Sequence, residues 1–142
     1  MLLWGGCRLV SPHRGTLWEG PTLMAEVWPA DPRLANAPGI HAYARRSECM
    51  EELLRNSACV PVGWWAILVR VRGYGRYVTG TYQGGVPGWR AERVVIDRLH
   101  VPPDVPAEIV AALAERYQCA VRIHHGWSAG LPCPGWDPAA HG

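Results

Sequence analysis

The feature that most constrains the fold is a stretch from Gly63 to Leu99 in which apolar and polar residues alternate and glycine recurs at turn-like intervals. Successive side chains of a β-strand point to opposite faces of a sheet, so a period of two residues predicts strands with one buried face. We therefore predict three consecutive antiparallel strands, with turns at Gly73–Gly75 and at Gln83–Gly88. The two predicted faces carry Ile67, Val69 and Val71 on one side and Leu68, Arg70 and Arg72 on the other.

The size and composition of the chain favour a single globular domain rich in short strands. A chain of 142 residues fits one domain. Hydrophobic residues make up 49% of it and charged residues 18%, which excludes an intrinsically disordered chain, and 13 prolines with 16 glycines leave little room for long helices. We expect one domain over residues 1–125 and a Gly/Pro-rich tail over residues 126–142.

Two further segments have helical patterns. Ser47 is placed to cap a helix that ends at Asn56–Ser57, and Asp104 is placed to cap a second helix through about Gln118. The alternation from Cys119 to His124 then predicts a strand that rejoins the sheet. Further strands are predicted at Cys7–Val10, Leu23–Trp28 and Ile40–Ala44. The expected fold class is α+β, a bent antiparallel sheet or small partly open barrel of about six short strands with two packed helices.

The spacing of the cysteines and the length of the apolar runs indicate where in the cell the protein is located. Five cysteines at wide, irregular spacing form no C-x-x-C pair and do not suggest a disulfide framework. No run approaches the roughly 20 apolar residues that a membrane span needs. We therefore expect a cytoplasmic protein with reduced thiols, no membrane partner and no cofactor.

Arginines and aromatic residues are interleaved along the predicted sheet. All 14 basic residues of the chain are arginine, which either reflects a GC-rich coding sequence or serves planar contacts to carboxylate, phosphate or base edges. The net charge of +2 is too small to decide between these explanations. The candidate binding residues are Arg70, Arg72, Tyr74, Arg76, Tyr77, Trp89, Arg90 and Arg93.

Three functional interpretations of this surface follow. The first is a non-enzymatic interaction module or small accessory subunit that binds a protein partner or larger assembly, because arginine beside exposed aromatic residues is typical of interaction hot spots. The alternative is a domain that binds single-stranded RNA or DNA on the same surface. The third is a solvated outer face, on which the arginines pair with Glu92, Asp97 and Glu115.

Catalysis and metal binding have weaker support in the sequence. No nucleophile elbow, P-loop or H-E-x-x-H motif is present, so no catalytic residue is assigned. Thiolate and imidazole ligands suit zinc, but the spacing of the available cysteines and histidines matches no known ligand pattern, and we expect no metal site. The candidate ligands would be Cys119, His124, His125 and Cys133.

Several short motifs resemble a loosely defined family of small bacterial proteins that has no assigned activity. The motifs are Gly39-Ile40-His41-Ala42-Tyr43-Ala44, Tyr74-Gly75-Arg76, Gly88-Trp89-Arg90-Ala91-Glu92 and Leu113-Ala114-Glu115-Arg116-Tyr117. The resemblance covers about residues 5–123 and supports the order of elements. Members of this group carry cysteines just before the Gly-Ile segment, where this chain has Leu34-Ala35-Asn36-Ala37-Pro38. If those cysteines bind metal in relatives, the resemblance implies that this chain has lost that site.

Overall fold

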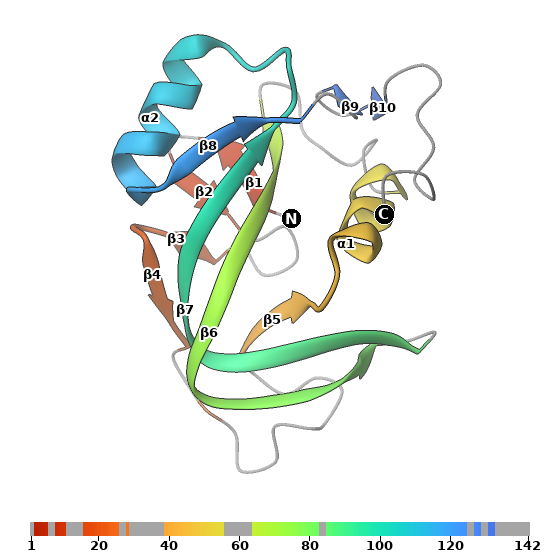
Figure 1. Ribbon diagram of the computed structural model, residues 1–142. Coiled ribbons are helices and arrows are strands. Elements are labelled where there is room, and N and C mark those ends of the chain that lie inside the picture. Colours follow the sequence, from red (N-terminus) through yellow and green to blue (C-terminus); the bar gives the residue numbers. More distant parts are fainter. Residues whose placement is uncertain are drawn as a thin grey trace.

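The computed structural model describes residues 2–5, 8–10, 16–25, 28, 39–55, 64–82, 85–124, 127–128 and 131–132. In chain order the elements are β1 (Leu2–Gly5), β2 (Arg8–Val10), β3 (Leu17–Trp18), β4 (Thr22–Met24), β5 (Ile40–Tyr43), α1 (Arg46–Arg55), β6 (Trp65–Tyr82), β7 (Val86–Val101), α2 (Ala107–Tyr117), β8 (Ala120–Ile123), β9 (Trp127–Ser128) and β10 (Leu131–Pro132). Figure 1 shows their arrangement.

One long antiparallel hairpin, β6 with β7, is the centre of the fold. The two strands pair from Leu68 opposite His100 to Tyr82 opposite Val86. The prediction of three strands in this stretch is therefore wrong, because Gly73–Gly75 lies within β6 and does not form a turn. The predicted assignment of faces holds, with Ile67 fully buried and Arg70 and Arg72 exposed.

Two β-bulges of opposite sense bend this hairpin. Between the pairs Arg70–Arg98 and Val71–Ile96 the register skips Asp97, which is an extra residue in β7. Between Tyr74 and Tyr77 the extra residue is in β6, so the second bulge restores the original register. Bulges increase twist and bend a strand. Figure 1 shows both strands bending together at the lower left, where their distal halves turn away from the rest of the sheet.

The remaining strands add to the two edges of the hairpin unequally. On the outer edge of β7, three strands follow one another: β5 pairs at residues 88–91, β4 at 93–95 and β8 at 98–101. On the outer edge of β6, β1 pairs with residues 65–67, followed by β2 and β3. Within the described residues no strand pairs with the outer edge of β6 from Leu68 to Tyr82. Arginine along an open edge discourages edge-to-edge association between molecules.

The result is an open mixed sheet of eight strands among the described residues. The α+β class with two helices is confirmed, whereas the predicted number of about six strands is too small. Purely antiparallel pairing is also wrong, because β8 pairs with β7 in parallel. A parallel neighbour needs a crossover connection, and α2 provides it between these two strands.

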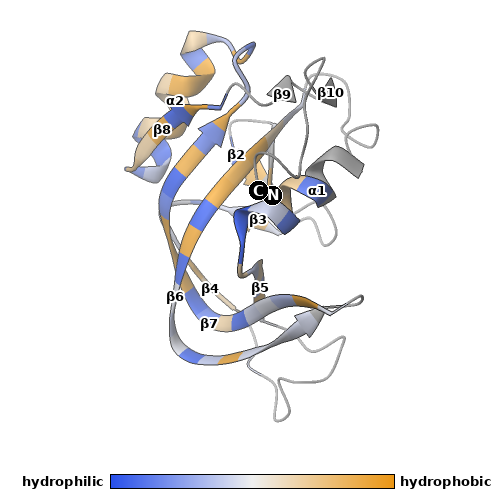
Figure 2. Cartoon of the chain, turned by 45° about the vertical axis from the view of Figure 1, so that its right-hand side comes forward, coloured by the Kyte–Doolittle hydropathy of each residue, from blue (hydrophilic) through white to orange (hydrophobic). Residues whose placement is uncertain are grey.

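The core lies on the inner face of the hairpin. Alternate residues of β7 point into it, and α2 packs against the same side with one apolar stripe. Figure 2 shows the corresponding hydrophobic and hydrophilic bands along β6 and β7. Trp4 and Trp18, from two of the N-terminal strands, are also buried there. The most buried members of the cluster are Leu9, Ile67, Ala91, Val94, Leu99, Val101, Leu113 and Tyr117.

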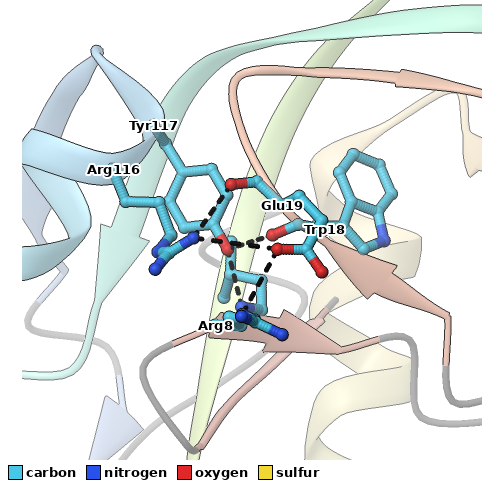
Figure 3. Close-up of polar contacts among 6 residues, drawn as sticks. Arg8, Trp18, Glu19, Arg116 and Tyr117 are labelled. Atoms are coloured by element: carbon cyan, nitrogen blue, oxygen red, sulfur yellow. Dashed lines mark hydrogen bonds and ion pairs between the residues drawn. The ribbon is translucent and has the colours of Figure 1, made fainter.

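Tyr117, the last residue of α2, connects this helix to the N-terminal strands (Figure 3). Its hydroxyl accepts a hydrogen bond from the Leu9 N–H at 2.7 Å and donates one to the Trp18 carbonyl oxygen at 2.6 Å. Burial raises the pKa of this hydroxyl above its usual value, so it stays protonated and able to donate. Beside it, Arg116 donates to the Glu19 carbonyl oxygen at 3.0 Å.

The capping residue predicted for α2 is wrong. Pro106 occupies the N-cap position, and no side chain makes a capping hydrogen bond there. Proline fixes its own backbone angle, which starts the helix without a side-chain cap. Neither described helix is long and apolar enough to cross a membrane.

Helix α1 lies on the opposite side of the hairpin from α2 in both views (Figure 1, Figure 2). It contacts β5 and β6. This position explains why Leu68, which shares the outer face with Arg70 and Arg72, is nevertheless only 4% exposed. The outer face is therefore covered near α1 and open beyond it.

Candidate functional site

We define the outer face as the side of the β6–β7 hairpin that points away from the core. Arg70, Arg72 and Tyr74 are two residues apart along β6 and so share this face. The side chains of Arg70 and Arg72 are 59% and 70% exposed, and Tyr74 is 44% exposed. Arg93, also exposed, is the register partner of Tyr74 on β7. The structure thus brings four of the predicted binding residues together.

The bulge residue Asp97 holds two of these arginines. Its Oδ2 lies 3.2 Å from Nε of Arg70, and its Oδ1 accepts a hydrogen bond of 2.9 Å from Nη2 of Arg72. Because Asp97 is the extra residue of the bulge, it lies beside both arginines without a register partner of its own. Exposed ion pairs contribute only about 0–1 kcal/mol to stability. The main effect of Asp97 is therefore to orient two guanidinium groups that remain largely exposed.

A second ion pair lies at the bend. Glu92 accepts hydrogen bonds from Nε of Arg76 at 3.0 Å, from its Nη2 at 3.2 Å and from its backbone N–H at 3.3 Å. These bonds lower the pKa of the Glu92 carboxyl and raise that of Arg76. The Arg76 guanidinium carbon also lies 5.7 Å from the centroid of the Trp28 ring, within cation–π range.

The other predicted residues fall into two groups. Tyr77 is 66% exposed beyond the bend. Trp89 is partly buried against the core, and a β-carbon added at Gly73 would lie only 2.9 Å from its ring. Trp89 is therefore not an exposed anchor, and Arg90 is partly buried as well. Arg70 and Arg72 do pair with Asp97, and Arg76 pairs with Glu92, although all three side chains stay exposed. The binding role of the eight candidate residues stays a prediction.

Sequence analysis missed further basic residues on the outer face. Across three neighbouring strands, Leu68, His100 and Arg122 are register partners, and Arg98 is opposite Arg70. Leu99 and Val101 are fully buried, so the alternation of β7 alone would have placed Arg98 and His100 outside. No pattern indicated Arg122, because the parallel pairing of β8 depends on the α2 crossover.

His100 lies in an unusual electrostatic environment. Its ring centroid is 6.3 Å from that of His124, in an edge-on arrangement. Burial, followed by the positive charges of Arg46, His124, Arg98 and Arg122, lowers the pKa of His100 to about 4. His100 is therefore neutral at pH 7.

This low pKa predicts a dependence of stability on pH. In the unfolded chain His100 titrates near its usual value of 6.5. As the pH falls below 6.5, the unfolded state takes up a proton that the folded state does not, so stability falls until about pH 4. The substitution His100→Gln should flatten this slope in urea unfolding measured at several pH values, and His41→Gln, at an exposed position of β5, should not. Equal slopes in the wild type and His100→Gln would contradict the assignment.

The described cysteines are buried or partly buried. Cys49 is buried, and burial with the charge of Asp97 raises the pKa of the Cys119 thiol, so that thiol is protonated at neutral pH. Among the described residues, no three or more His, Cys, Asp or Glu side chains are grouped closely enough to hold a metal ion. Of the four candidate ligands, His125 and Cys133 lie outside the described residues.

Comparison of the chain with protein-family models, with curated proteins and with solved structures found no match. The resemblance drawn from the sequence motifs therefore stays a prediction, and the functional argument depends on the geometry of the outer face.

Proposed function

We propose that this chain is a non-enzymatic interaction module, a small accessory subunit that binds an acidic surface of a protein partner through its outer face. The observation that carries the proposal is the placement of Arg70, Arg72, Tyr74 and Arg93 side by side and exposed, with two of the arginines oriented by Asp97. A cytoplasmic location with reduced thiols is part of the same proposal.

Two physical reasons support this proposal: the low entropy cost of ordering these side chains on binding, and their charge complementarity with an acidic surface. Ordering a long side chain on binding costs about 0.5–1.5 kcal/mol, and arginines that already have an orienting partner lose less. Tyrosine and arginine are enriched among the residues that dominate binding energy. The outer face carries more arginines than carboxylates, which favours an acidic partner and speeds its association.

The experiment is capture of partners from the native host, followed by size-exclusion chromatography with the captured protein. The double substitution Arg70→Ala and Arg72→Ala should weaken the complex about tenfold or more at moderate salt. Arg45→Ala is the matched control, since this exposed arginine also pairs with a carboxylate, Glu48, but lies outside the outer face. A monomer without any partner under gentle conditions, or equal losses in both variants, would count against the proposal.

A second candidate function is binding of single-stranded nucleic acid. The observation that favours it is the continuation of the basic surface to Arg98 and Arg122, with the exposed ring of Tyr74 farther along the same face of β6 for base stacking. Titration with single-stranded RNA and DNA at two salt concentrations tests it, because phosphate contacts make affinity fall steeply with salt. Undetectable affinity at low salt, or affinity unchanged by the Arg70→Ala and Arg72→Ala pair, would exclude this candidate.

A further inference from the structure

The described arginines differ in whether a carboxylate neutralises them. Ion pairs with Glu19, Glu48, Asp97 or Glu92 hold six of them: Arg8, Arg116, Arg45, Arg70, Arg72 and Arg76. Within the described residues, Arg46, Arg93, Arg98 and Arg122 have no such pair. Three of these four surround His100.

The cluster is assembled from three elements that are distant in the sequence. Arg98 and His100 are two residues apart on β7 and share its outer face. Arg122 is the register partner of His100 on β8, and His124 follows two residues later with its ring edge-on to His100. A hydrogen bond of 2.8 Å from the His124 N–H to the Val101 carbonyl oxygen holds the end of β8 in this position. Arg46 is the first residue of α1, whose contact with β6 brings it to the same end of the sheet.

We propose that this histidine–arginine cluster (Arg46, Arg98, His100, Arg122 and His124) is a binding site for a doubly charged phosphate group. The proposal stands independently of the proposed function, because it concerns arginines that form no ion pair with another described residue, and not the arginines paired with Asp97.

The chemistry of the cluster fits a phosphate better than other ligands. Guanidinium groups present planar pairs of N–H donors that match phosphate oxygens, and such charge-assisted bonds are roughly twice as strong as neutral ones. Among the described residues, the charged or titratable groups that act on His100 are all basic: Arg98 on its own strand, Arg122 and His124 from β8 and the residue after it, and Arg46 from α1. On β6 its neighbour is the apolar Leu68. A site of this charge repels metal cations and prefers a dianion to a monoanion.

Binding at this site should be coupled to proton uptake by His100. Burial, together with the surrounding positive charge, keeps the free imidazole neutral at pH 7. A bound dianion opposes that charge, so it raises the pKa of His100 and favours the imidazolium, which can donate a further hydrogen bond to the ligand. Sulfate keeps its double charge as the pH falls, so a rise in its affinity on acidification comes from protonation of the protein and not of the ligand.

The test is titration of the full chain with inorganic phosphate and with sulfate at constant ionic strength, followed by NMR of the histidine rings and by calorimetry. We expect millimolar binding that shifts the His100 ring signals, with affinity for sulfate rising as the pH is lowered from 7. Arg98→Gln and Arg122→Gln should each weaken binding about tenfold, since each removes charge-assisted hydrogen bonds.

The matched control is Arg8→Gln, because it also removes one positive charge from a partly exposed arginine, but Arg8 lies on β2, outside the cluster. Unchanged affinity in this variant supports a defined site. A loss of affinity equal to that of Arg122→Gln would show that binding depends only on the net charge of the protein, and would overturn the proposal. Circular dichroism of each variant separates loss of binding from loss of fold.

The source of the phosphate is resolved by comparing inorganic phosphate with an oligonucleotide that has or lacks a 5′-phosphate. Tighter binding of the phosphorylated oligonucleotide supports a terminal phosphate as the ligand, and equal binding of inorganic phosphate supports the free ion. Binding that requires only backbone diesters, with no response to inorganic phosphate, would overturn the proposal.

Discussion

Replacing Tyr117 with phenylalanine is expected to lower the free energy of unfolding by about 2–4 kcal/mol. The phenylalanine ring still fills the fully buried site, so the apolar packing of α2 is retained. What is lost is the hydroxyl that accepts from Leu9 and donates to Trp18. Both backbone groups then stay buried without this partner, and each such group costs about 1–3 kcal/mol.

Urea unfolding of the wild type and of Tyr117→Phe measures this loss. The matched control is Tyr77→Phe, which removes the same atom from a side chain that is 66% exposed. That change should stay within about 0.5 kcal/mol, as is usual for surface positions. Similar stabilities for the two variants would show that the hydroxyl of Tyr117 does not connect α2 to the N-terminal strands.

The sequence predicts the faces of the central strands better than their number. Alternation is a local property, so the inward direction of Ile67 and the outward direction of Arg70 follow from it directly. Glycine, in contrast, marks turns and bulges alike, and nothing local separates the bulge at Gly75 from a hairpin turn. The sharing of one edge of β7 among β4, β5 and β8 depends on long-range packing and has no sequence signal.

The candidate sites also differ in whether they depend on local sequence signals or on long-range packing. Asp97 was predicted as a carboxylate partner for the arginines of the sheet, and it pairs with Arg70 and Arg72. The meeting of Arg46 and Arg122 around His100 could not be predicted, since it requires both the docking of α1 and a parallel β8. Residues that converge through tertiary packing are visible only once the fold is known.

Substituting valine for Gly75 is expected to cost about 2 kcal/mol or more of stability and to distort the bend of the hairpin. Gly75 has a φ of +79°, which a β-branched side chain adopts only under strain. A β-carbon there would also lie 3.3 Å from Oε2 of Glu92, the oxygen that accepts from the backbone and guanidinium of Arg76. The substitution should therefore loosen the ion pair at the bend as well as strain the bulge.

Gly80→Val is the control for this prediction, because Gly80 lies in the same strand with no atom within 4 Å of an added β-carbon and no positive φ. Valine favours strands, so this variant should be as stable as the wild type or slightly more stable. Unfolding free energies and amide exchange along β6 distinguish the two changes. If Gly75→Val were as stable as Gly80→Val and kept the exchange pattern of the wild type, the bulge would tolerate a side chain, and the bend would have to arise from the Asp97 bulge and from the packing of Trp89 over Gly73.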